Sequence, residues 1–227
     1  QFMAATGAAL MPSPFRFDRH GECGLPVSEI FAQVGRHADR LAVLRSCHHE
    51  SFIHGPALSL MHTGSLLLGH PSVGAWVVYG LGSVSDELPA YVVMSDNGIV
   101  RNGVGSFGAG FRPAVHQGTM LRSEGTAIQN LAPPEAVSIG QQRALLNQVA
   151  AWNRRHAAER TEDSRLEARI ANYELAFRMQ TAAPQLVDLG GETAATHQLY
   201  GLDAAPTERF GRMCLLARRM VERGVRY

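Results

Sequence analysis

Two short apolar runs separated by helical segments constrain the fold of this chain most. Leu41–Arg45 (LAVLR) and Tyr91–Met94 (YVVM) lack the polar and apolar alternation of a half-exposed strand, as is typical of strands buried on both faces. Between them, residues 56–63 and 71–80 read as helices, because each begins at a proline and is followed by glycine. Strand, helices, strand is the order of a parallel sheet with crossover helices. The order therefore predicts an α/β fold with a mostly parallel sheet flanked by helices.

The second half of the chain is predicted to be rich in helix. Residues 140–159 and 164–184 carry apolar stripes and are predicted to form an antiparallel hairpin that Pro184 ends. The second of these helices opens on a capping box, Ser164 to Glu167. A last helix is expected over residues 207–223, and the residues after it read as the start of a strand.

The remaining segments complete the expected organisation. Residues 27–37 read as a helix with Ser28 as its N-cap, and the glycine-rich residues 97–125 as a long loop. We expect one incomplete α/β domain over residues 1–227, made of three parts. These are a strand-helix core (1–96), a glycine-rich loop region (97–135) and a helical segment (136–224).

Composition excludes several classes of protein. The chain is 45% hydrophobic and 18% charged, which fits a globular domain. Its 21 basic residues, all arginine, nearly balance 20 acidic ones, and this argues against nucleic acid as the main partner. The three cysteines are widely spaced, so neither a disulfide framework nor a cysteine-type zinc site is indicated. No apolar run reaches membrane-spanning length.

Histidines gather in residues 46–64, SCHHESFIHGPALSLMHTG. His48 and His49 are adjacent and point apart in a strand or loop, and the spacing of the whole group matches no compact metal-ligand motif. For these two histidines a structural and a functional role stay open. His54 is the best functional candidate, since it precedes the predicted helix at Pro56. Backbone N–H groups at a helix N-terminus bind phosphate, sulfate or carboxylate.

The segment IHGPALSLMHTG is similar to the activation segment of sulfatases and related hydrolases of the alkaline phosphatase superfamily. Their pattern is a nucleophile, any residue, Pro-Ser-Arg, four residues and Thr-Gly. His54 falls on the nucleophile, Pro56 on the proline and Thr63-Gly64 on the final pair. The nucleophile is therefore histidine instead of cysteine, serine or threonine, and Ala57-Leu58 replace the Ser-Arg pair.

Longer stretches resemble an uncharacterised bacterial branch of that superfamily, the DUF1501 proteins. They include GHPSVGAWVVYGLGSVSDELPAYVVM, GAGFRPAVHQGT and YGLDAAPTERFGRMCLLARRMVERGVRY, and the resemblance covers nearly the whole chain. It implies a partial sandwich of the alkaline phosphatase and sulfatase type, of which this chain is a central fragment. It also implies an exported, extracytoplasmic protein. One or two divalent metal ions are implied for the intact domain, with most ligands in flanking segments and none assignable in this chain.

Three interpretations of function follow from the resemblance and the residues. The first is a metal-dependent hydrolase of sulfate or phosphate esters, with His54 in the nucleophile position and Arg45 and His49 as contacts to the anion. The alternative is a non-catalytic protein that binds an anion or a sulfated glycan on a degenerate hydrolase scaffold. In the third, this chain alone is inactive, because missing strands expose its sheet edges. The substrate, the metal and the oligomeric state are not indicated.

Overall fold

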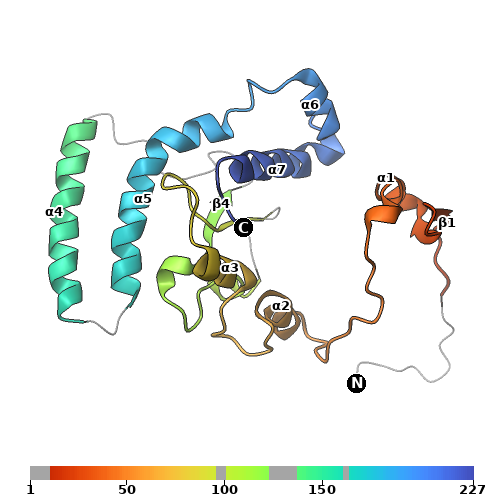
Figure 1. Ribbon diagram of the computed structural model, residues 1–227, viewed down its shortest axis with the longest axis horizontal. Coiled ribbons are helices and arrows are strands. Elements are labelled where there is room, and N and C mark those ends of the chain that lie inside the picture. The colour runs from red at the N-terminus through yellow and green to blue at the C-terminus, as the bar shows by residue number, and fades with distance from the viewer. Residues whose placement is uncertain (1–10, 96–100, 123–136, 161–163) are drawn as a thin grey trace. The chain divides into compact units, whose positions relative to one another are not determined.

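The computed structural model describes residues 11–95, 101–122, 137–160 and 164–227 (Figure 1). The chain divides into two compact units, Gln1–His49 and Glu50–Tyr227. It is a mixed α/β protein in which helices dominate, and the described residues form two small sheets. One sheet is an antiparallel pair and the other a parallel pair.

The first unit is built on a β-hairpin. Strands β1 (Phe17–His20) and β2 (Leu25–Ser28) pair antiparallel with Phe17 opposite Ser28. The carboxylate of Asp39 fixes the turn between them, because it accepts the backbone N–H groups of Glu22 and Cys23 at 3.1 and 2.9 Å. Short helical turns follow the hairpin: η1 (Glu29–Phe31), α1 (Ala32–Gly35) and η2 (Ala38–Arg40).

Two predictions for the first unit are wrong. Leu41–Arg45 forms no strand and Leu44 is 76% exposed, since no strand in the described part of the chain pairs with this run. Nor is there one helix over residues 27–37. Val27 and Ser28 pair with Asp18 and Phe17 of β1 instead, and this tertiary pairing outweighs the local helical pattern.

The second unit confirms the two helices predicted before the second apolar run. Helix α2 (His54–Thr63) ends at Gly64, whose φ of 76° is left-handed, and it begins two residues earlier than expected. Helix α3 (Val73–Leu81) begins at Ser72, whose hydroxyl accepts the N–H of Ala75.

The predicted parallel strand at Tyr91–Met94 is also present, as β3 (Val92–Ser95). It pairs in parallel with β4 (Thr119–Arg122), with Val92 opposite Thr119. On the other edge of β3, Tyr227 N–H donates to the Ala90 carbonyl at 3.1 Å, and its own carbonyl accepts from Val92 N–H at 2.8 Å. These two bonds have the pattern of a parallel ladder. The residues after the last helix therefore pair with β3 as the strand predicted there would.

Strand β4 lies where the sequence predicts only a glycine-rich loop. The described residues 101–122 hold two 3-10 turns as well, η3 (Gly103–Ser106) and η4 (Ala114–His116). The four residues of β4 are too few for a clear periodic signal, and their extended state comes from pairing with β3.

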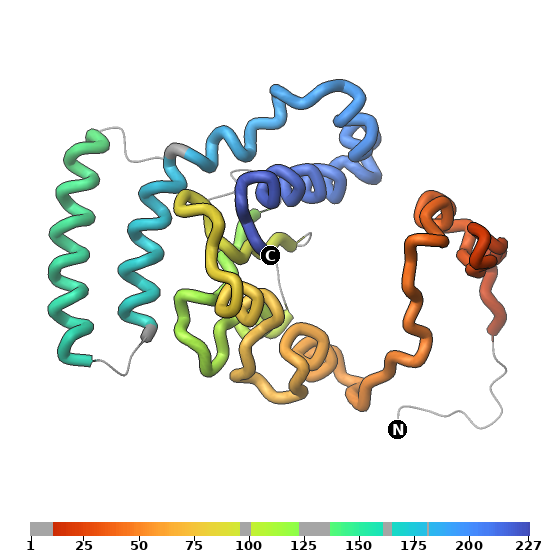
Figure 2. The backbone as a smooth tube through the Cα atoms, viewed as in Figure 1, coloured from red at the N-terminus to blue at the C-terminus, as the bar shows by residue number. Residues whose placement is uncertain are grey.

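The long helices form the predicted antiparallel hairpin, with α4 (Ile139–Ala158) packed against α5 (Ser164–Val187) (Figure 2). Arg143 on α4 joins them, because it donates to the carboxylate of Glu174 at 2.8 Å and lies 3.9 Å over the Phe177 ring. Pro184 does not end α5. The helix continues to Val187, since a proline near the end removes only one backbone hydrogen bond. The predicted capping box at Ser164 lies outside the described side chains.

Two further helices, α6 (Ala194–Leu199) and the predicted last helix α7 (Ala205–Glu222), complete the second unit. Helix α7 contributes Leu215, Leu216 and Met220 to the main core, where they meet Leu186 of α5 and Leu121 of β4. This core joins the end of the helical hairpin to the parallel sheet. None of the helices in the described ranges is both long and apolar enough to cross a membrane.

Candidate anion-binding site

His54 is the first residue of α2, so the structure puts the sequence-predicted site residue at a helix N-terminus. The residue before it, Ile53, has the extended backbone of an N-cap but a side chain that cannot accept the free N–H groups. The side chain of His54 is exposed. Its position agrees with the prediction, and its chemical role stays a prediction.

The glycine-rich segment is fastened to the turn that carries His54. Asn102 has a left-handed backbone, with φ of 63°, and its side-chain amide donates to the carbonyl of Gly55 at 2.8 Å. Asparagine tolerates this conformation better than most residues. The bond brings the start of η3 against the first turn of α2.

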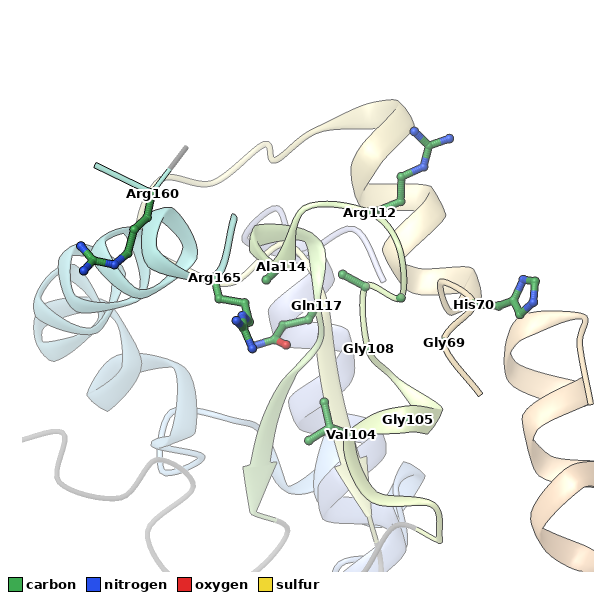
Figure 3. Close-up of a pocket in the computed structure, with 12 residues that line it drawn as sticks. Gly69, His70, Val104, Gly105, Gly108, Arg112, Ala114, Gln117, Arg160 and Arg165 are labelled. Atoms are coloured by element: carbon green, nitrogen blue, oxygen red, sulfur yellow. The ribbon is translucent and has the colours of Figure 1, made fainter. Parts of the chain in front are cut away.

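The same glycine-rich segment lines much of a cavity of about 740 Å³ (Figure 3). Three arginines line it, together with His70 and Gln117, and none of its described lining residues is acidic. Figure 3 shows Arg160 and Arg165 on one side of the cavity and Arg112 and His70 on the other. The lining is therefore basic, which favours an anionic ligand, although Figure 3 shows the guanidinium groups of Arg112 and Arg160 pointing in different directions.

Glycines form much of the cavity wall, and the fold requires at least one of them. Gly110 has φ of 56°, and a Cβ there would meet the backbone between Gly69 and Pro71. The neighbouring Gly108 is held by Ser72 at the start of α3, whose N–H and hydroxyl both donate to its carbonyl at 3.1 and 3.2 Å. Backbone without side chains lets a ligand approach closely.

Arg112 lies between the cavity and the aromatic side chains of α3. Its guanidinium carbon is 4.4 Å from the centre of the Trp76 ring and 4.1 Å from that of Tyr79. Burial, and then the charge of Arg112, lower the pKa of nearby His116. This part of the site therefore has a fixed positive charge beside a histidine that favours its neutral form.

Arg160 and Arg165 come from the facing ends of the helical hairpin. Arg160 follows α4 and lies 3.1 Å from the ring of His156 and 3.4 Å from the carboxylate of Glu159. The contact with Glu159 is exposed on both sides, so water screens it. The same Arg160 nitrogen also donates to the His156 carbonyl at 3.2 Å. Packing of α5 against η4 brings Arg165 to the cavity.

The other predicted anion contacts belong to the first unit. Arg45 lines a separate cavity there whose walls are mainly apolar, and His49 is exposed. His54 is not among the residues lining the arginine cavity, although η3 contacts α2 and also lines that cavity. Sequence reasoning missed Arg112, Arg160 and Arg165. The available signal was the pair of arginines that flank the helical hairpin turn, beside a glycine-rich segment.

The described residues do not form a metal site. No three histidine, cysteine, aspartate or glutamate side chains among them lie close enough to hold a metal ion. The divalent metal implied by the resemblance therefore has no ligands that we can assign here.

Comparison with known proteins adds one match. The model of the family described as "Protein of unknown function (DUF1501)" matches residues 1–227. This mixed α/β chain with an arginine-lined cavity belongs to that family. No curated protein and no solved structure matches it.

Proposed function

We propose that this chain binds the anionic group of a sulfate or phosphate ester, as part of a sulfatase-like hydrolase. The basic lining of the cavity carries the proposal, because it includes Arg112, Arg160 and Arg165 and no acidic residue is among its described lining residues. The resemblance around His54 supports the ester class, and the parallel pairing of β3 with β4 and with Tyr227 is compatible with the sandwich of that superfamily.

In this proposal the arginine cavity holds an anionic group of the substrate, and His54, which does not line that cavity, lies at a separate reacting centre at the start of α2. The neutral imidazole attacks the sulfur or phosphorus atom, and the ester alcohol leaves with a proton from water. A second water then cleaves the new bond to nitrogen and releases sulfate or phosphate. Free N–H groups at the start of α2 would stabilise the oxygens of the transferring group.

A second candidate is a non-catalytic protein that binds an anion or a glycan. Two substitutions favour it. His54 stands where sulfatases have cysteine, serine or threonine, and Ala57-Leu58 replace a Ser-Arg pair. Binding in the arginine cavity is common to both candidates, and turnover separates them.

The test is hydrolysis of aryl sulfates and aryl phosphates by the protein at its full natural length, with Mn, Zn or Ca added. The hydrolase predicts turnover that His54→Ala removes and His62→Ala, a change in the same helix, leaves intact. Binding of the esters without turnover at any metal supports the second candidate. Turnover unchanged by His54→Ala removes His54 from the mechanism.

A further inference from the structure

Helix α4 is supported by the rest of the second unit on one side only. Helix α5 packs against it, and no other described element makes an extensive contact with α4 (Figure 1). Of the twenty residues of α4, only Ala150 is buried. The other faces of this long helix are therefore open to a partner.

One of these open faces carries two large apolar side chains. Leu145 is 60% exposed and Trp152 is 58% exposed. They are seven residues apart, almost two helical turns, so they share one face of α4. Gln141, Gln148 and His156 are exposed and continue the row at helical spacing. We call these five residues the α4 stripe. An exposed tryptophan in an apolar pair is typical of a protein interface.

The α4 stripe is complementary to a second copy of itself. When two copies of α4 pack antiparallel with Leu145 of one against Trp152 of the other, the same contact forms twice, on either side of a two-fold axis near Gln148. Gln141 of each copy then lies opposite His156 of the other. A glutamine amide both donates and accepts, so it can bond either tautomer of an imidazole. Apolar side chains therefore meet apolar ones, and polar ends meet polar ends.

The charges of α4 also favour the antiparallel pair. Glu159, the C-cap, would lie level with Ser138, the N-cap of the other copy, where the positive end of the helix dipole attracts a carboxylate. Arg155 would lie level with the uncharged Gln142. In a parallel pair each charged side chain would lie beside its own copy, and like charges would repel each other.

We propose that the α4 stripe is an interface between two copies of this chain, in which α4 packs antiparallel against α4. The stripe contains no arginine and no acidic residue, so its chemistry selects neither an acidic nor a basic partner, whereas its symmetry selects a second copy. Two apolar side chains from each copy bury less than the roughly 1,000 Å² of a stable interface. The dimer is therefore weak, with an expected dissociation constant of about 10–100 µM. This inference is independent of the proposed function, since it needs no anion.

Sedimentation equilibrium of the protein from about 1 to about 500 µM tests the dimer. We expect a reversible equilibrium between monomer and dimer, and Trp152→Ala should weaken it at least about tenfold. Phe210→Ala is the matched control, because Phe210 is an aromatic side chain on α7 that is 65% exposed and outside the stripe. It should leave the equilibrium unchanged. Unchanged far-UV circular dichroism shows that both variants keep their fold.

A pair of charge variants tests the antiparallel register. Leu145→Glu and Trp152→Arg should each weaken self-association, because each homodimer loses both of its Leu145–Trp152 contacts. A mixture of the two variants should recover. One contact of the mixed dimer is then the original one, and the other joins the introduced carboxylate to the introduced guanidinium. We expect the mixed dimer to be at least about tenfold tighter than either variant alone.

Three results would overturn the inference, and none of them bears on anion binding. A protein that stays monomeric at every concentration has a stripe that is open to solvent or takes a different partner. A dimer that Trp152→Ala leaves unchanged uses another surface. A mixture that associates no more tightly than its separate variants does not pack α4 antiparallel in this register.

Discussion

Asn102 and Gly55 lie 47 positions apart in the sequence, and a hydrogen bond of 2.8 Å joins the side-chain amide of the first to the carbonyl of the second. The bond connects the glycine-rich segment to the first turn of α2, where His54 lies. The glycine-rich segment therefore contacts α2, the helix that His54 begins, and also forms a wall of the arginine cavity.

Replacing Asn102 should separate the two contributions of this residue. Asn102→Ala loses the hydrogen bond, worth about 1 kcal/mol, and leaves a left-handed backbone that alanine tolerates less well than asparagine, by up to about 1 kcal/mol. Asn102→Gly loses the bond without the strain. Urea denaturation should therefore show a larger loss of stability for alanine than for glycine. Equal losses would show that the backbone at Asn102 is not strained.

Two glycines of α3 should respond in opposite ways to alanine. A Cβ at Gly74 would clash with the rings of Tyr91 and Tyr227, so Gly74→Ala should destabilise the second unit by about 1–3 kcal/mol. Gly80 has open space around it, and Gly80→Ala should be neutral or stabilising by up to about 1 kcal/mol. Thermal denaturation of the pair checks this. A stable Gly74→Ala would mean that the packing of Tyr227 on α3 is wrong.

Glu192 should make stability depend on pH. Hydrogen bonds from Arg218 at 2.9 Å and Arg219 at 2.7 Å lower its pKa, with Arg218 the larger cause. The stabilisation is complete above the ordinary pKa of a glutamate and is lost as pH falls through the lowered value. Glu192→Gln should therefore flatten the fall in urea midpoint between about pH 6 and about pH 3.

The control for this measurement is Glu222→Gln. Glu222 also pairs with Arg218, but its side chain is 57% exposed, so its ion pair should matter little. A pH dependence that survives Glu192→Gln unchanged would assign the effect to other carboxylates.

The fold could be predicted where local signals and tertiary structure agree. Gly64 and Ser72 mark the limits of α2 and α3, whereas the capping box of Ser138 and Gln141 that starts α4 was not predicted. Prediction failed where pairing decides the outcome. The run at Leu41–Arg45 has the composition of a strand without a described partner, and β4 is a strand because β3 pairs with it.

The candidate site shows the same limit of sequence reasoning. His54 could be identified from the sequence, because a helix start and a family pattern both mark it. The cavity could not be identified from the sequence. Arg112 and Arg165 are 53 positions apart, and both line it only because α5 packs against η4.

The most direct test of the account is calorimetric binding of inorganic sulfate and phosphate to the protein and to a triple variant, Arg112→Gln, Arg160→Gln and Arg165→Gln. A matched variant, Arg154→Gln with Arg155→Gln, removes exposed charge from α4 outside the cavity. We predict binding by the unchanged protein and the matched variant, and at least about a tenfold loss of affinity in the triple variant. Equal affinity in all three proteins would contradict anion binding in the arginine cavity.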